Sequence, residues 1–172
     1  MKISTHRIRT PIGHLVGFAE KEGICGLFFF DEDQILSNDL HEKFDGEVEI
    51  IKGEDKNLQN LEIQLDEYFQ HKRKHFDLPL ALKGTLFQQE IWSLLLQIPY
   101  GTVISYKKLS DLWGDPKAIR AVAAANGANP VSILVPCHRV IGADGSMTGY
   151  AGGIWRKQWL LDHEKDQLRL NL

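Results

Sequence analysis

Residues 3–9, 14–20 and 24–30 form three runs of apolar and polar residues that are rich in strand-forming types, and these runs predict β-strands. Pro11-Ile12-Gly13 and Lys21-Glu22-Gly23 separate the three runs and are typical of tight turns. Strands joined by such short turns pair antiparallel, so the pattern predicts a meander. Residues 47–51 can add a strand, and residues 75–83 are expected to form a strand that leads into an interdomain linker.

Further along the chain, apolar residues recur every three or four positions, which is the period of a helix with one buried face. Leu58, Leu61 and Leu65 predict a helix over 56–71. Thr85 and Gln88 have the spacing of a capping box and predict a helix from there to about residue 97. The last helix is expected over about 154–168, after a loop rich in glycine.

Two short helices in the second half have the pattern of a helix-turn-helix unit. Ser105 can cap a helix over 106–113, Gly114-Asp115 breaks it, and Pro116 is expected in the first turn of a second helix that ends near residue 127. Such a pair is more often a packing unit than a DNA reader. Lys117 and Arg120 on the second helix favour DNA binding, with Ile119, Val122 and Ala123 as its inner face.

The most reactive residues follow a short apolar run over 129–135, which predicts a strand that ends at Pro136. Cys137, His138 and Arg139 come next. Neighbouring side chains of a strand point to opposite faces, so a bend at Pro136 is needed before the thiol and the imidazole can serve one site. The two basic neighbours would favour the thiolate, which is the nucleophilic form. The alternative is a small buried cysteine beside surface basic residues.

Glu164 lies on the last predicted helix, four residues after Leu160 and three after Leu161. A carboxylate beside an apolar stripe needs a partner. The spacing alone leaves two readings equally open, a structural salt bridge or a group that orients His138.

The run from Pro136 to Val140 resembles the active-site signature of the O6-alkylguanine-DNA alkyltransferases, which repair DNA by accepting an alkyl group. The resemblance covers about residues 84–166, and over 1–83 it rests on length and pattern. Further matching segments are Phe87-Gln88-Gln89-Glu90-Ile91-Trp92, Ile98-Pro99-Tyr100-Gly101-Thr102-Val103-Ile104-Ser105-Tyr106, Arg120-Ala121-Val122, Asn129-Pro130, Gly149-Tyr150-Ala151-Gly152-Gly153 and Leu160-Leu161-Asp162-His163-Glu164.

The resemblance implies a role for each matching residue. Cys137 is the alkyl acceptor, His138 takes the thiol proton through a bridging water, and Glu164 positions the imidazole. Tyr106 donates a proton to guanine N3 and also lies by the target phosphate. The remaining residues fall into two groups. Those expected at the DNA are Arg120, as the finger that fills the vacated base stack, with Lys117, Ala121, Asn129 and Arg139; those expected at the base pocket are Val140, Gly149, Tyr150 and Ala151.

The resemblance also implies an α+β fold. An N-terminal α/β domain, ribonuclease-H-like with antiparallel strands, would span residues 1–83, and a mainly helical winged helix-turn-helix domain would span 84–172. The implied activity is single-turnover transfer from O6-alkylguanine in duplex DNA, with O4-alkylthymine as a further substrate class. No cofactor and no metal are implied. Ala151 replaces a serine common in the vertebrate pattern, which leaves the lesion size open.

Composition narrows the alternatives. Hydrophobic residues make up 43% of the 172 residues and charged residues 25%, which is ordinary for a globular protein. We expect the protein to be cytoplasmic and monomeric and to have no membrane partner. The net charge of −3 is not a nucleic-acid signature, so DNA must meet a local basic face. Two distant cysteines, Cys25 and Cys137, do not suggest a disulfide. The rival functions are lesion recognition without transfer, a Cys-His-Glu thiol hydrolase and a transcription regulator.

Overall fold

The computed structural model describes residues 2–30, 44, 48–51 and 54–170. The chain divides into two compact units, residues 1–82 and 83–172. In the described ranges, no helix combines the length and the apolar content needed to cross a bilayer.

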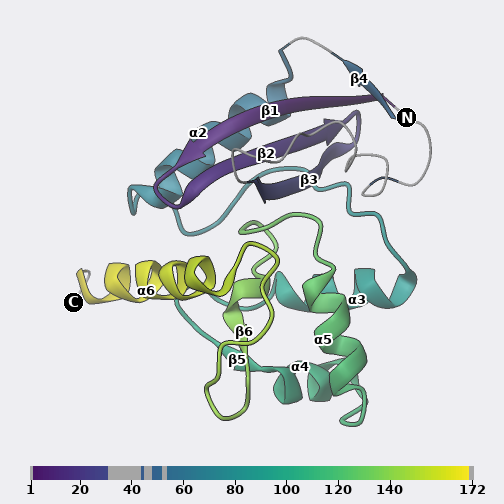
Figure 1. Cartoon of the computed structure of the whole chain (residues 1–172), viewed down its shortest axis with the longest axis vertical. Helices are drawn as coiled ribbons and strands as arrows, with labels where there is room; N and C mark the ends of the chain where they lie inside the picture. The colour runs from purple at the N-terminus through teal and green to yellow at the C-terminus, as the bar shows by residue number, and fades with distance from the viewer. Residues whose placement is uncertain (1, 31–43, 45–47, 52–53, 171–172) are drawn as a thin grey trace. The chain divides into compact units, whose positions relative to one another are not determined.

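The first unit is built on a sheet of four strands in the order β3-β2-β1-β4 (Figure 1). β1 (Lys2–Thr10), β2 (Gly13–Glu20) and β3 (Gly23–Phe30) pair antiparallel, which confirms the predicted meander. The predicted fourth strand is present as β4 (Glu49–Ile51) and pairs parallel with β1. Residue 47, where that strand was expected to begin, lies outside the described residues.

Helix α2 (Lys56–Phe69) packs against β1, β2 and β3. Its first turn is capped by Asp55, whose carboxylate accepts from the backbone N–H groups of residues 57 and 58. The buried face carries Leu58, Leu61, Leu65 and Tyr68, as the helical spacing predicts. Gly17 of β2 permits the close approach, because a Cβ there would lie 2.9 Å from Leu61 Cδ2.

The predicted strand over 75–83 is wrong. Leu80 alone forms an isolated bridge, with Ile24, in which Ile24 donates to the carbonyl of Pro79 and Ala81 donates to that of Ile24. Pro79 has no N–H to extend this pairing into a ladder.

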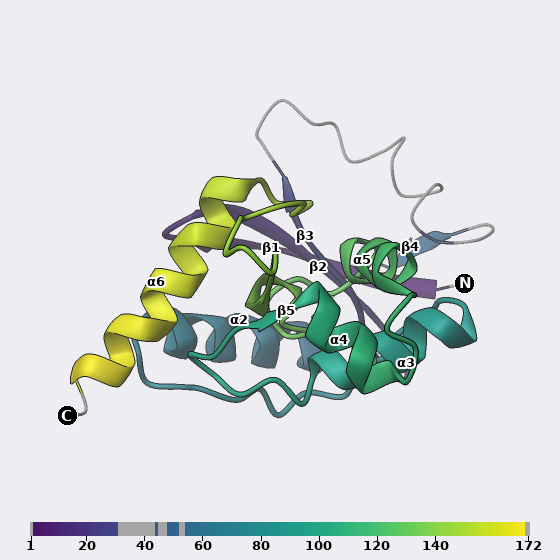
Figure 2. The same ribbon diagram turned by 90° about the horizontal axis from the view of Figure 1, so that it is seen from below.

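The second unit begins with α3 (Leu86–Leu95), which packs against α4 (Tyr106–Trp113) and α5 (Ile119–Gly127) (Figure 2). The capping box at Thr85 is present with both reciprocal hydrogen bonds. Trp92 is buried and donates from its indole N–H to the carbonyl of Ala125, 2.9 Å away. This bond joins α3 to α5 inside the core of the second unit.

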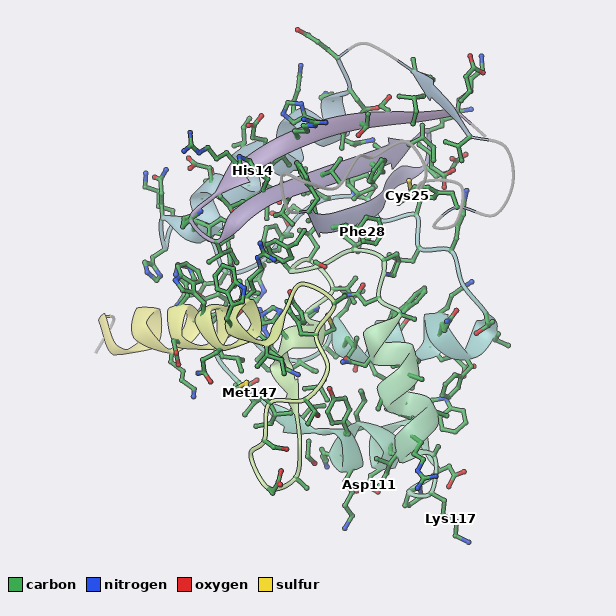
Figure 3. All side chains as sticks on the ribbon, viewed as in Figure 1. His14, Cys25, Phe28, Asp111, Lys117 and Met147 are labelled. Atoms are coloured by element: carbon green, nitrogen blue, oxygen red, sulfur yellow. The ribbon has the colours of Figure 1, made fainter. Side chains whose placement is uncertain are left out.

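The turn between α4 and α5 differs from the prediction. Ser105 caps α4 and Gly114 ends it with a φ of 105°, as predicted. However, α5 begins at Ile119, so Lys117 lies in the turn and points outward (Figure 3). The Asp115 carboxylate accepts a hydrogen bond from the Lys117 N–H, and this bond stabilises the turn before α5. Ile119, expected on the inner face, is 38% exposed.

The second unit also contains a short strand pair and the C-terminal helix. β5 (Ile104–Ser105) and β6 (Val140–Ile141) form a short parallel pair, with Ile104 opposite Val140. This pair fixes the chain just after Arg139 beside the start of α4. The C-terminal helix α6 (Ile154–Leu170) begins where the glycine-rich loop ends, as predicted.

Candidate active site

The segment before the thiol is a series of turns and not the predicted strand. Asn129 causes the difference. Its side-chain amide donates to the carbonyls of Val131 and Val135, while its Oδ1 accepts from the Val131 N–H. A strand would have to give up these buried bonds. These turns impose backbone strain at Ile133, because its φ of 71° is in the left-handed region that branched side chains disfavour.

Cys137 opens a single turn of 3₁₀-helix over Cys137–Arg139. The Cys137 N–H donates to the carbonyl of Val135 at 2.8 Å, and the Arg139 N–H donates to that of Pro136 at 3.0 Å. The tight turn provides the bend that the Cys-His pair requires. All three side chains of the turn are buried.

The sulfur of Cys137 is held by Asn129, whose Nδ2 lies 3.1 Å from Sγ. Asn126, at the end of α5, donates to the Cys137 carbonyl at 3.4 Å. Burial raises the pKa of the thiol, while the Asn129 hydrogen bond and the charge of Lys157 act to lower it. The thiol is therefore protonated at rest, and a proton must be removed before it attacks. This differs from the expectation that its two basic neighbours favour the thiolate.

His138 and Glu164 form the base and its partner. The distance from His138 Nε2 to Glu164 Oε1 is 2.8 Å, and both side chains are fully buried. Burial lowers the pKa of His138 even though Glu164 acts to raise it, so the imidazole is neutral near pH 7. Its Nδ1 is buried and makes no hydrogen bond with the described residues. With Nε2–H donating to Glu164, Nδ1 is a free acceptor for a proton.

Arg139 occupies the other side of Glu164. Its Nε lies 2.9 Å from Oε2 and its Nη2 3.0 Å from Oε1, a bidentate pair, and Nη1 donates to the carbonyl of Ile98 at 2.7 Å. The expected DNA contact at Arg139 is therefore corrected, because the guanidinium is buried on the carboxylate. Both alternatives that the sequence left open for Glu164 are present, because the carboxylate forms an ion pair with Arg139 and a hydrogen bond with His138.

Glu164 is also bonded to the backbone N–H of Gly101, 3.1 Å from Oε2. Burial alone would raise the pKa of this carboxyl. The charges and hydrogen bonds of His138 and Arg139 outweigh burial and lower the pKa well below its ordinary value. The carboxylate therefore stays ionised throughout the neutral pH range.

Tyr106 and Lys157 form a second group near the thiol. The Tyr106 hydroxyl donates to the carbonyl of Thr148 at 3.1 Å, and Lys157 Nζ lies 3.1 Å from that carbonyl and 3.5 Å from the hydroxyl. Burial raises the pKa of Tyr106, the hydrogen bond to Thr148 acts to lower it, and Cys137 in its thiolate form acts to raise it. The phenol is thus held neutral, as a proton donor.

Lys157 was not identified from the sequence. Its side chain is fully buried, and burial lowers the pKa of its ammonium while the charge of Cys137 acts to raise it. A signal existed: Lys157 lies three residues before Leu160 and seven before Glu164, both fully buried, and this spacing places all three on one helical face.

The loop over residues 148–153 holds most of the expected base-pocket residues. The Tyr150 hydroxyl is buried, and burial, followed by the charge of Cys137, raises its pKa. Gly149 and Ala151 are exposed, and Gly149 has a φ of 57°. Val140, expected in the same pocket, is buried in β6.

The residues expected at the DNA lie at two kinds of place. Arg120 and Ala121 are exposed on α5, and Lys117 is exposed in the turn before it. Asn129 is instead buried at the thiol. The exposed face of α5 and the thiol are connected through Asn126, which lies at the end of the same helix.

Two family models match the chain. The ribonuclease-like domain of 6-O-methylguanine DNA methyltransferase matches residues 3–82, and the DNA-binding domain of the same family matches residues 86–166. The chain belongs to the 6-O-methylguanine DNA methyltransferase family. The α+β fold, with a ribonuclease-like first unit and a mainly helical second unit, is confirmed.

Individual relatives agree over nearly the whole chain. The methylated-DNA-protein-cysteine methyltransferase of Shigella flexneri is 42% identical over 95% of this chain and 96% of its own. The constitutive enzyme of that name from Bacillus subtilis is 42% identical over 91% and 92%. The crystal structure of the Mycobacterium tuberculosis O6-methylguanine methyltransferase has a TM-score of 0.82 at 39% identity, covering 99% of each chain. A structure of the M. tuberculosis protein in complex with DNA has a TM-score of 0.80, at 39% identity, covering 97% of this chain and 94% of that one.

Proposed function

We propose that this protein repairs alkylated DNA by accepting the alkyl group of O6-alkylguanine on Cys137, once per molecule. The observation that carries the proposal is the buried thiol that Asn129 holds, one residue before a neutral imidazole bonded to Glu164, in a domain of a DNA methyltransferase family. The same geometry extends to O4-alkylthymine if the pocket admits a pyrimidine.

The contacts support the following chemistry. His138 Nδ1 takes the thiol proton through a water, and the imidazolium is stabilised by Glu164. The sulfur lone pair forms a bond to the alkyl carbon as the bond from that carbon to O6 breaks. The electron pair left on the purine is neutralised by a proton from Tyr106 to guanine N3. The product is a thioether, which water does not cleave, so turnover ends after one transfer.

The alkylated base must leave the duplex to reach a buried sulfur. In this proposal α5 enters the minor groove with its exposed face. Arg120 fills the space left by the flipped base, and Ala121 lets the backbone approach closely. Lys117 contacts phosphate from the turn before α5. Residues 1–83 support this domain, and the protein acts as a monomer inside the cell, where its DNA substrate is.

A thiol hydrolase is the second candidate by side-chain chemistry. It needs free backbone N–H donors at the thiol to hold an oxyanion. Here the N–H groups of Cys137 and Arg139 are already bonded to Val135 and Pro136. Lesion recognition without transfer remains as the alternative that a direct experiment must exclude.

The experiment is to incubate the protein with duplex DNA that contains one O6-methylguanine and to record its intact mass. We expect the addition of one methyl per molecule, located on Cys137 by peptide mapping and lost in Cys137→Ala. The Cys25→Ala variant is the matched control and should accept the methyl normally, since Cys25 is a buried core residue of β3. Tight binding without added mass would favour lesion recognition, and continued turnover would favour hydrolysis.

A further inference from the structure

Two consecutive residues at the start of α6 hold the loop over residues 148–153. Arg156 is buried, although it carries a guanidinium, and Trp155 beside it is 56% exposed. The guanidinium carbon of Arg156 lies 4.7 Å from the centre of the Trp155 ring, a cation–π contact. Arg156 Nη1 donates to the carbonyl of Gly152 at 2.8 Å. One guanidinium therefore binds the loop backbone and an aromatic face at the same time.

The backbone of the same turn adds to this hold. The Gly153 N–H donates to the Tyr150 carbonyl, and the Gly153 carbonyl accepts from the N–H groups of Arg156 and Lys157. Gly149 and Gly153 both have positive φ, 57° and 90°, and glycine can leave such conformations at little cost. A loop with two such hinges keeps one shape only if side chains outside it hold it. Among the described side chains, Arg156 is placed to do so at the Gly152 end of the loop.

This loop adjoins the thiol. Thr148 at its start accepts hydrogen bonds from both Tyr106 and Lys157, and the charge of Lys157 acts on Cys137. Burial raises the pKa of Tyr150, and charges on Cys137 and Arg156 make smaller contributions to that pKa. A displacement of the loop would therefore move the carbonyl that holds Tyr106 and Lys157 in place near the thiol.

We propose that Arg156 is a positioning residue that holds the 148–153 loop against Trp155 and thereby limits the size of the O6 substituent that Cys137 can accept. The inference rests on the proposed function. Lysine can replace arginine here only in part, because an ammonium lacks the planar group that lies over the indole while it also binds the Gly152 carbonyl.

The test measures single-turnover transfer from duplexes that carry O6-methylguanine or O6-benzylguanine, for the wild type, Arg156→Gln and Arg156→Lys. With Arg156→Gln we expect methyl transfer to slow by about tenfold or more, since a small misplacement of reacting groups has effects of that size. Benzyl transfer should slow less, so the benzyl-to-methyl rate ratio rises. The benzyl-to-methyl rate ratio of Arg156→Lys should lie between those of the wild type and Arg156→Gln.

Lys165→Gln is the matched control, because it removes an exposed positive charge from the same helix. Its rate ratio should equal that of the wild type. Trp155→Ala should raise the ratio, and Trp155→Phe should keep it, since the aromatic face is retained.

The inference would be overturned if Arg156→Gln slowed methyl and benzyl transfer equally, and by no more than the fall in folded fraction that urea unfolding measures. Arg156 would then be a structural residue. If Arg156→Gln does not fold, an unchanged ratio in Arg156→Lys and Trp155→Ala would overturn it equally. A wild type that transfers neither group would overturn the proposed function itself.

Discussion

Glu164→Gln is the most informative single change, because both oxygens of the carboxylate accept hydrogen bonds from buried groups of the described residues. Oε1 accepts from His138 and Arg139, and Oε2 accepts from Arg139 and Gly101. An amide offers one oxygen and one NH₂ group, so whichever way it turns, an N–H group faces donors of Arg139. If the NH₂ faces His138 Nε2, the imidazole proton moves to Nδ1, which can then no longer accept the thiol proton.

The magnitude has two parts. Arg139 becomes a buried cation without its carboxylate, and removing one partner of such a pair costs about 3–5 kcal/mol of folding stability. Loss of the oriented base should slow alkyl transfer by about 10²–10⁴-fold in the protein that remains folded. The first part is measured by urea unfolding and the second by single-turnover transfer from O6-methylguanine DNA, with saturating lesion and a correction for the folded fraction.

The pH dependence separates these effects from general damage. The pKa of Glu164 is depressed in the folded protein, so its contribution to stability is present above the ordinary carboxyl pKa of about 4.3 and is lost as the pH falls below that value. Burial also depresses the pKa of His138, which adds a loss of stability as the pH falls through about 6.5. Glu164→Gln should flatten the acid part of this profile. A folded variant with the wild-type transfer rate would refute the assigned role of Glu164.

Three further predictions concern the thiol and the DNA surface. Lys157→Met should slow transfer and move the pH at which iodoacetamide alkylates Cys137 upward, because a positive charge that lowers the thiol pKa is removed. Asn129→Asp should slow transfer and cost about 1–3 kcal/mol in urea unfolding, since a carboxylate cannot donate to Sγ or to the carbonyls it now faces. Arg120→Ala should weaken binding to lesion duplexes in fluorescence anisotropy and change stability by less than about 0.5 kcal/mol, because Arg120 is exposed.

Each of these predictions has an outcome that contradicts it. Lys165→Met removes an exposed charge and is the control for Lys157→Met. If both variants move the pH profile of Cys137 alkylation equally, the claim that Lys157 lowers the thiol pKa by its proximity is wrong. Wild-type reactivity of Cys137 in Asn129→Asp would show that the bond to sulfur is not functional. Unchanged affinity of Arg120→Ala at several salt concentrations would remove α5 from the proposed DNA surface.

The elements that the sequence predicts well are those with local signals. The meander of β1 to β3 follows from strand-forming runs and from the turn residues that lie between them in the chain. The starts of α3 and α4 follow from Thr85 and Ser105, each bonded to a backbone group three residues on. The motif around Cys137 marks the reactive thiol, since its residues are adjacent in the chain.

Tertiary structure decided what those residues contact. The apolar run over 129–135 has strand propensity, but buried hydrogen bonds from Asn129 fold it into turns, because an unpaired buried amide costs more than lost propensity. Arg139 binds Glu164, 25 residues away, and Lys157 meets Tyr106, 51 residues away. Contacts between residues so far apart in the chain give no local sequence pattern. Sequence alone determined which groups are reactive, and the packing of α6 against the 3₁₀ turn determined their partners, their burial and therefore their protonation.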